Sequence, residues 1–125
     1  MEKLILIVED DPDLARLMAE VLDAAGYRTA IAANGREALE PLRMNNRPDL
    51  ILLDMMMPVM DGWAFREEQR KLREAASIPV VVVTADGDAR RKAASLQAAG
   101  YLAKPISTDG LLDAVERVCG MANAK

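Results

Sequence analysis

Five polar residues of the kinds that handle phosphate and metal ions each follow an apolar run of the sequence. In chain order they are Glu9, Asp10, Asp54, Thr84 and Lys104. Any one of them has an ordinary explanation as a helix cap, a strand end or a solvated charge. If the apolar runs are parallel strands, however, their carboxyl ends meet at one edge of the sheet, where open α/β sheets bind ligands. Five such residues at one edge therefore indicate a functional site.

The chemistry that this set supports is phosphoryl transfer. Three carboxylates at one edge repel one another and need either a metal ion or raised pKa values. Oxygen-only ligands with an open solvent side favour Mg²⁺, which joins carboxylates to a phosphoryl group. Lys104 adds a positive charge, and Thr84 adds a hydroxyl donor for phosphate oxygens. Because the sequence has no glycine-rich nucleotide loop, the expected acceptor is a side chain, and an aspartate can carry phosphate as an acyl phosphate.

The elements that would bring these residues together alternate between strand and helix patterns. Aliphatic runs predict strands over 4–8, 27–32, 50–53, 78–83 and 100–103. Apolar residues at helical spacing predict helices over 12–26, from 35 onward, from 62 to about 75, from about 88 to 98, and over the stripe 111–119. This alternation predicts an α/β fold: a doubly wound, five-stranded parallel sheet with right-handed crossovers and helices on both faces.

Local features refine the predicted elements. Asp11 suits the N-cap of the first helix. Pro41 lies inside the second helix, where it removes a backbone donor, so we expect a kink or an early end there. In the third helix, Glu67 stands one turn before Lys71, which predicts a surface ion pair. The fourth helix is expected to be weak and mobile, because its inward residues are mostly alanine and the cations at 90–92 lie near its N-terminus.

Composition narrows the functional classes. The 125 residues suit one domain spanning 1–125, and 3% aromatic residues predict an aliphatic core. The net charge of −4 argues against direct nucleic-acid binding, which needs a clustered basic surface. The absence of histidine excludes Ser-His-Asp and Cys-His catalysis, and Cys119 alone makes no intrachain disulfide. The first apolar run is too short to span a bilayer and no signal-peptide pattern is present, so we expect a soluble, cytoplasmic protein without membrane insertion.

Four segments together resemble one known family, the receiver domains of bacterial two-component response regulators, which have the CheY-like, flavodoxin-like fold. The matching segments are 5–11, 52–62, 82–85 and 101–105. The resemblance covers essentially the whole chain, and the four motifs together are highly specific. It implies the strand order 2-1-3-4-5 and a role as a phosphoacceptor that signals to a partner protein.

Carried over by position, the resemblance implies a phosphoacceptor and a metal site. Asp54 looks like the phosphoacceptor and also a ligand of Mg²⁺ or Mn²⁺. Asp10 and the backbone carbonyl of Met56 resemble further metal ligands, and Glu9 resembles one that acts partly through water.

The resemblance also implies a switch and a donor. Thr84 and Lys104 would contact the phosphoryl oxygens, and Tyr101 matches the switch aromatic, against an ordinary reading as a half-buried strand tyrosine. The switching face would comprise the fourth helix, the fifth strand and the fifth helix. The phosphoryl group would come from a sensor histidine kinase or a histidine phosphotransfer protein, since this chain has no histidine. Such a domain is not an enzyme beyond self-catalysed transfer and slow autodephosphorylation.

Two departures from the family pattern concern the loops around the site. The interval from Thr84 to Lys104 is a couple of residues shorter than usual, which predicts a trimmed fourth helix or a trimmed loop into the fifth strand. Met56 and Asp86 stand two positions beyond Asp54 and Thr84, where the family tunes the access of water to the acyl phosphate. An apolar Met beside an acidic Asp leaves the direction of that tuning open.

Three other functions are alternatives to this one. An aspartyl-phosphate phosphatase of the haloacid dehalogenase type would need an acid where Met56 stands. A flavodoxin-like nucleotide-binding module would need a glycine- or hydroxyl-rich loop, whereas residues 9–12 are Glu-Asp-Asp-Pro and repel phosphate. A receiver that acts only as an unphosphorylated interaction scaffold is distinguished by a phosphorylation assay alone.

Overall fold

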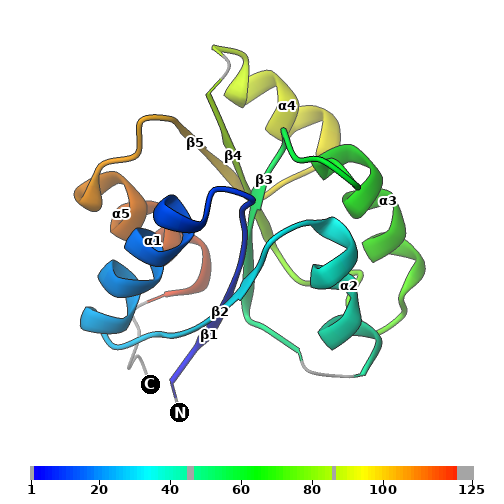
Figure 1. The fold of residues 1–125 in the computed structure, drawn as a ribbon, viewed down its shortest axis with the longest axis horizontal. Coiled ribbons are helices and arrows are strands. Elements are labelled where there is room, and N and C mark those ends of the chain that lie inside the picture. Colours follow the sequence, from blue (N-terminus) through cyan, green and yellow to red (C-terminus); the bar gives the residue numbers. More distant parts are fainter. Residues whose placement is uncertain (1, 45–46, 86, 121–125) are drawn as a thin grey trace.

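Strands and helices alternate strictly in the computed structural model, which describes residues 2–44, 47–85 and 87–120 (Figure 1). The elements are β1 (Leu4–Val8), α1 (Pro12–Ala24), β2 (Arg28–Ala32), α2 (Gly35–Arg43), β3 (Leu50–Asp54), α3 (Gly62–Lys71), β4 (Val80–Thr84), α4 (Ala89–Leu96), β5 (Gly100–Ala103) and α5 (Thr108–Cys119). The predicted α/β alternation is confirmed.

The strands form one parallel sheet in the order β2-β1-β3-β4-β5, as predicted. Its register brings the carboxyl ends of the central strands level with one another. Val8 pairs with Leu53 between β1 and β3, and Thr84 pairs with Ala103 between β4 and β5. The residues that follow these positions therefore emerge side by side at one edge of the sheet.

Helices cover both faces of the sheet, with α1 and α5 on one side and α2, α3 and α4 on the other (Figure 1). Side chains alternate between the two layers along each strand. In β3, Ile51 and Leu53 pack into the layer that contains Phe65 of α3, while Leu50 and Leu52 pack into the other layer. Every residue of β3 and β4 is buried, so these strands form a rigid base for what they carry at their ends.

Side-chain caps fix where the helices begin. The Asp11 carboxylate accepts hydrogen bonds from the backbone N–H groups of Asp13 and Leu14, which confirms Asp11 as the N-cap of α1. Asp61 caps α3 in the same way by accepting from the Ala64 N–H. Since Asp11 takes the capping position, Asp10 is left to face the carboxyl edge of the sheet.

Three predictions about helix ends and surface pairs need correction or refinement. Helix α3 ends at Lys71, not near 75, because Leu72 adopts an extended backbone. Lys71 pairs with Glu68 at 3.0 Å, so the predicted pair with Glu67 is wrong. Helix α2 runs through Pro41 and ends two residues later at Arg43, in line with the expected early end.

Helix α4 is shorter than predicted, because Gln97 takes a left-handed conformation with φ 54° and ends the helix at Leu96. This is consistent with the trimmed fourth helix expected from the short interval between Thr84 and Lys104. The predicted mobility of α4 stays a prediction, and Asp86 lies outside the described residues. Within the described part of the chain, no helix is both long enough and apolar enough to cross a bilayer.

Candidate functional site

The three predicted carboxylates come together at the carboxyl edge of the sheet. Glu9 and Asp10 follow β1, and Asp54 is the last residue of β3. One ligand oxygen from each of them lies within 4.8 Å of the other two. Glu9 and Asp54 are each only 2% exposed, whereas Asp10 is exposed to solvent. The cluster therefore consists of two buried acids and one that is exposed to solvent.

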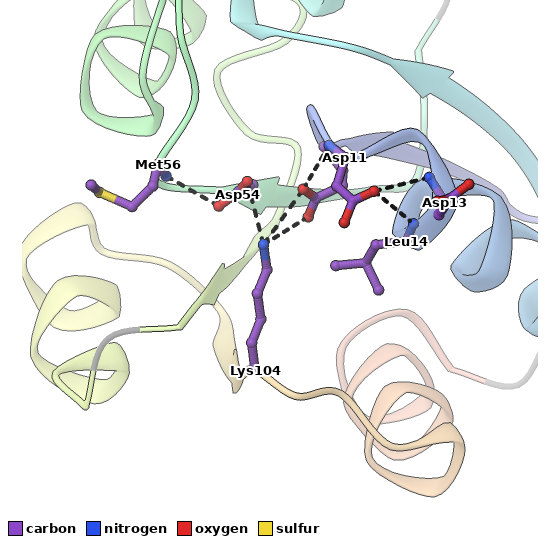
Figure 2. Close-up of polar contacts among 7 residues, drawn as sticks. Asp11, Asp13, Leu14, Asp54, Met56 and Lys104 are labelled. Atoms are coloured by element: carbon purple, nitrogen blue, oxygen red, sulfur yellow. Dashed lines mark hydrogen bonds and ion pairs between the residues drawn. The ribbon is translucent and has the colours of Figure 1, made fainter.

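Lys104 reaches this cluster from the loop after β5 (Figure 2). Its Nζ lies 3.2 Å from Oε1 of Glu9 and 3.5 Å from Oδ2 of Asp54. The backbone N–H of Lys104 donates to the carbonyl of Thr84 at 2.9 Å. This bond continues the β4–β5 pairing and holds the Lys104 backbone next to the end of β4. One ammonium group thus contacts two carboxylates from different strands.

The two carboxylate oxygens of Glu9 differ: one accepts a backbone hydrogen bond and the other accepts none from the described residues. Its Oε2 accepts from the Asp11 N–H at 3.1 Å. Its Oε1, although near Lys104 Nζ, has no hydrogen-bond partner among residues 2–44, 47–85 and 87–120. Burial raises the pKa of Glu9 to about 7; the Asp11 N–H opposes this shift and the charge of Asp54 adds to it. A buried oxygen in this state is ready to bind a cation.

Asp54 experiences the same opposing influences. Burial raises its pKa, while the Met56 N–H, which donates to Oδ1 at 3.1 Å, and the charge of Lys104 act to lower it. For Lys104, burial alone would lower the pKa, but the charges of Asp54 and Glu9 outweigh burial and raise it. Three carboxylates against one ammonium leave an excess of negative charge, which a divalent cation would neutralise.

The loop after β3 holds its backbone close to the site. The side chain of Met56 is 69% exposed and points away from Asp54, while its backbone N–H faces the carboxylate (Figure 2). The loop then folds back so tightly that a Cβ on Gly62 would lie 2.5 Å from Sδ of Met55 and 2.9 Å from its Cα. Glycine is therefore required where α3 begins.

The two remaining predicted residues differ in exposure. Thr84 is the last residue of β4, its side chain is fully buried, and it stands at the same edge as Asp54. Tyr101 on β5 is 46% exposed, which places it at the surface. The structure thus brings Glu9, Asp10, Asp54 and Lys104 into direct proximity, with Thr84 on the adjacent strand and Tyr101 at the surface of β5.

One feature of the site loop has no signal in the sequence. Val59 has φ 71°, and the N–H of Met60 donates to the carbonyl of Pro58 at 2.7 Å across it, which makes a γ-turn of the strained type. A β-branched residue rarely adopts this conformation, and glycine or asparagine would have been the expected marker. The Val59 side chain is 68% exposed.

Comparison with known proteins identifies the family. The profile of the family described as "Response regulator receiver domain" matches residues 5–116. Sporulation initiation phosphotransferase F of Bacillus subtilis is 39% identical over 119 residues, covering 94% of each chain. The polar-differentiation response regulator DivK of Brucella anthropi is 35% identical over 98% of this chain and all of its own.

A solved structure agrees with these sequence relatives. The receiver domain of the sensor histidine kinase PA1611 from Pseudomonas aeruginosa, described with a magnesium ion coordinated in its active-site cleft, superposes with a TM-score of 0.85 at 31% identity. The match covers 96% of this chain and 99% of that one. Against several other relatives, including DNA-binding response regulators, the chain spans about half of their length. The resemblance predicted from the sequence is confirmed: the chain belongs to the response regulator receiver domain family of two-component signalling proteins.

Proposed function

We propose that Asp54 accepts a phosphoryl group and carries it as an acyl phosphate. The observation that supports this most is the convergence of Glu9, Asp10 and Asp54 within 4.8 Å, with Lys104 Nζ at 3.2 and 3.5 Å from two of them. Asp54 is the member best suited to accept, because it ends β3, the central strand of the sheet, with β1 on one side and β4 and β5 on the other. Its carboxylate is oriented by the Met56 N–H on one oxygen and Lys104 on the other.

The same residues fit a divalent cation. Carboxylate oxygens from Glu9, Asp10 and Asp54 are the hard ligands that Mg²⁺ or Mn²⁺ takes, and the buried Oε1 of Glu9 lacks a hydrogen bond. We assign the backbone carbonyl of Met56 to the same set, by its position in the loop next to Asp54. When bound, the cation would neutralise the excess negative charge and bring phosphoryl oxygens next to Asp54.

The cationic and hydroxyl groups act on the transferred phosphoryl group. The Lys104 ammonium, already between Glu9 and Asp54, moves toward the phosphoryl oxygens as a compact positive charge. The Thr84 hydroxyl donates to another phosphoryl oxygen from the end of the neighbouring strand. Tyr101 on β5 then turns inward as Thr84 moves, which reshapes the face formed by α4, β5 and α5 and signals to a partner protein.

The donor is a phosphohistidine on a second protein, a sensor histidine kinase or a histidine phosphotransfer protein, because this chain has no histidine. An oxygen of Asp54 forms the new bond to phosphorus while the bond from phosphorus to the imidazole nitrogen breaks. The bonding electron pair stays on that nitrogen. The chain promotes its own modification and later hydrolysis, and in this sense is a phosphoacceptor with self-catalysis, not a turnover enzyme.

Two further expectations stay proposals. Residues 1–125 form one receiver domain, consistent with the near full-length match to DivK. A cytoplasmic location follows from the proposed exchange with a kinase or phosphotransfer protein that uses nucleotide-derived phosphate.

The proposal is tested by intact mass after incubation with acetyl phosphate and Mg²⁺. We expect one added phosphate on the wild type and none on Asp54→Asn. The matched control is Asp13→Asn, since Asp13 is an exposed aspartate on α1 outside the acidic cluster, and it should be labelled like the wild type. Equal labelling of Asp54→Asn, or no labelling of the wild type with or without Mg²⁺, would overturn the assignment.

A further inference from the structure

Helix α4 is anchored at its C-terminal end by side chains of α3. The Arg66 guanidinium donates from Nε to the carbonyl of Leu96 at 3.1 Å and from Nη2 to the carbonyl of Gln97 at 3.1 Å. Arg70 donates to the same Leu96 carbonyl at 2.6 Å and to Oε1 of Gln97 at 3.1 Å. These carbonyls belong to the last turn of α4, where the helix itself offers no donors.

Arg66 is a buried cation, only 7% exposed, and no carboxylate lies within ion-pair distance of it in the described part of the chain. Burial lowers its pKa, and the charge of Arg70 adds to this shift. Its partners are the negative end of the α4 dipole and neutral oxygens. Moving the last turn of α4 would leave Nε and Nη2 of this guanidinium buried without acceptors, which is strongly unfavourable.

Gln69 connects Arg66 by hydrogen bonds to the turn that precedes β4. Its side chain is fully buried; Oε1 accepts from Nη1 of Arg66 at 2.9 Å, and Nε2 donates to the carbonyls of Ala75 and Ile78 at 2.9 and 3.1 Å. Both carbonyls belong to the turn that leads into β4. The end of α4 is thus linked by an unbroken set of hydrogen bonds to a segment whose backbone cannot shift without disturbing the buried strand.

The N-terminal end of α4 has the opposite character. The Asp88 side chain makes no capping hydrogen bond to the helix, and no acidic residue stands in the first turn. The exposed cations Arg90 and Arg91 lie instead at the positive end of the dipole, where they destabilise the helix. Of the buried side chains of α4, only Leu96 is large, and it too lies at the C-terminal end.

We propose that Arg66, supported by Gln69 and Arg70, is a fixed pivot for α4, so that phosphorylation displaces the N-terminal half of this helix while its last turn stays in place. The proposal rests on the proposed function, since the stimulus is a phosphoryl group on Asp54. The displacement enters through Thr84, which precedes the loop into the N-terminal end of α4. Arg66 is a positioning residue, and the surface presented to a partner changes around Arg90 and Arg91.

Hydrogen–deuterium exchange tests the pivot, with beryllofluoride and Mg²⁺ as the mimic of an aspartyl phosphate. In the wild type we expect the mimic to change exchange at amides 88–92 and to leave amides 93–98 unchanged. In Arg66→Met, which keeps bulk but removes the donors, amides 93–98 should exchange about tenfold faster, and the mimic should now alter them as well. The matched control is Arg73→Met, an exposed arginine beyond the end of α3, which should behave like the wild type.

Arg70→Met removes only the outer guanidinium, and it is the variant to measure if Arg66→Met does not fold. In Arg70→Met we expect amides 93–98 to exchange about threefold faster than in the wild type. The pivot is overturned if the mimic changes 93–98 as much as 88–92 in the wild type, or if Arg66→Met and Arg70→Met exchange like Arg73→Met. Binding of the mimic is tested separately: the changes in exchange that it causes in the wild type should be absent in Asp54→Asn. If the wild type does not bind the mimic, the proposed function fails, and the variants compared without the mimic still decide the anchor.

Discussion

Two clusters in this molecule contain buried polar side chains and are built in opposite ways. At the carboxyl edge of the sheet, Glu9 and Asp54 carry like charges, have raised pKa values, and leave one oxygen without a hydrogen bond. Between α3 and α4, Arg66 and Gln69 have a hydrogen bond on every polar side-chain nitrogen and oxygen. Complete pairing favours stability, whereas incomplete pairing marks the place where a ligand is expected to enter.

The largest expected effect breaks the complete cluster. Gln69→Leu removes two donors and one acceptor, so the carbonyl of Ile78 and one nitrogen of Arg66 remain buried without partners, and the carbonyl of Ala75 keeps only the bond from the Ile78 N–H. We expect the free energy of unfolding to fall by about 3 kcal/mol. Urea unfolding measures this loss. A loss below about 1 kcal/mol would mean that the network between α3 and α4 does not carry the stability assigned to it.

The next largest effect is the binding of Mg²⁺ to the acidic cluster. Mg²⁺ at a free concentration of 100 times its dissociation constant should raise the free energy of unfolding by about 2.7 kcal/mol. Thermal unfolding with and without Mg²⁺ measures the gain. Gln69→Leu should gain as much as the wild type, because the two clusters share no residue, whereas Glu9→Gln should gain clearly less. An equal gain in Glu9→Gln would remove Glu9 from the metal site.

The pH dependence of stability also separates the clusters. In metal-free protein the pKa of Glu9 is about 7 when folded and 4.5 when unfolded, so the folded state binds more protons between these values. Stability should therefore fall as the pH rises from 4.5 to 7, by an amount on the order of 2 kcal/mol. Urea unfolding in EDTA across this range measures the slope. Glu9→Gln should flatten it and Gln69→Leu should keep it; a wild-type stability that rises over this range would contradict the assignment.

The smallest effect concerns the strained turn beside the acidic cluster. Val59→Asn should raise the free energy of unfolding by about 1 kcal/mol, because asparagine tolerates a positive φ better than a β-branched residue. Val59→Ala is the control, since it removes the exposed side chain without favouring this backbone, and it should gain less. If Val59→Asn is less stable than the wild type, the turn is not a source of strain.

The acidic cluster was predictable from the sequence, and the network between α3 and α4 was not. Asp54 and Lys104 stand directly after short aliphatic runs, so the parallel-sheet geometry alone brings them to one edge. Arg66 and Gln69 carry a weaker signal, a polar pair at three-residue spacing on the inward side of a helix that also buries Phe65. Their partners are backbone carbonyls 6 to 31 positions away in the chain, which no local pattern specifies.

The ends of helices were the other part that local patterns missed. The helical spacing of apolar residues predicts a third helix to about residue 75, but α3 ends at Lys71 and the turn that follows delivers two carbonyls to Gln69. Helix α4 ends at Leu96 because Gln97 turns left-handed, although glutamine rarely marks such a position. In both cases tertiary hydrogen bonds outweighed local propensity.

The phosphoacceptor assignment is tested most directly by chemical trapping at residue level. The protein is incubated with acetyl phosphate and Mg²⁺ and then reduced with borohydride, which converts an aspartyl phosphate to homoserine, and peptides are mapped by mass. We predict homoserine at position 54 in samples that contain Mg²⁺, and unmodified aspartate there when EDTA is present. Conversion at Asp10 or another acidic residue with Asp54 unchanged would contradict the assignment.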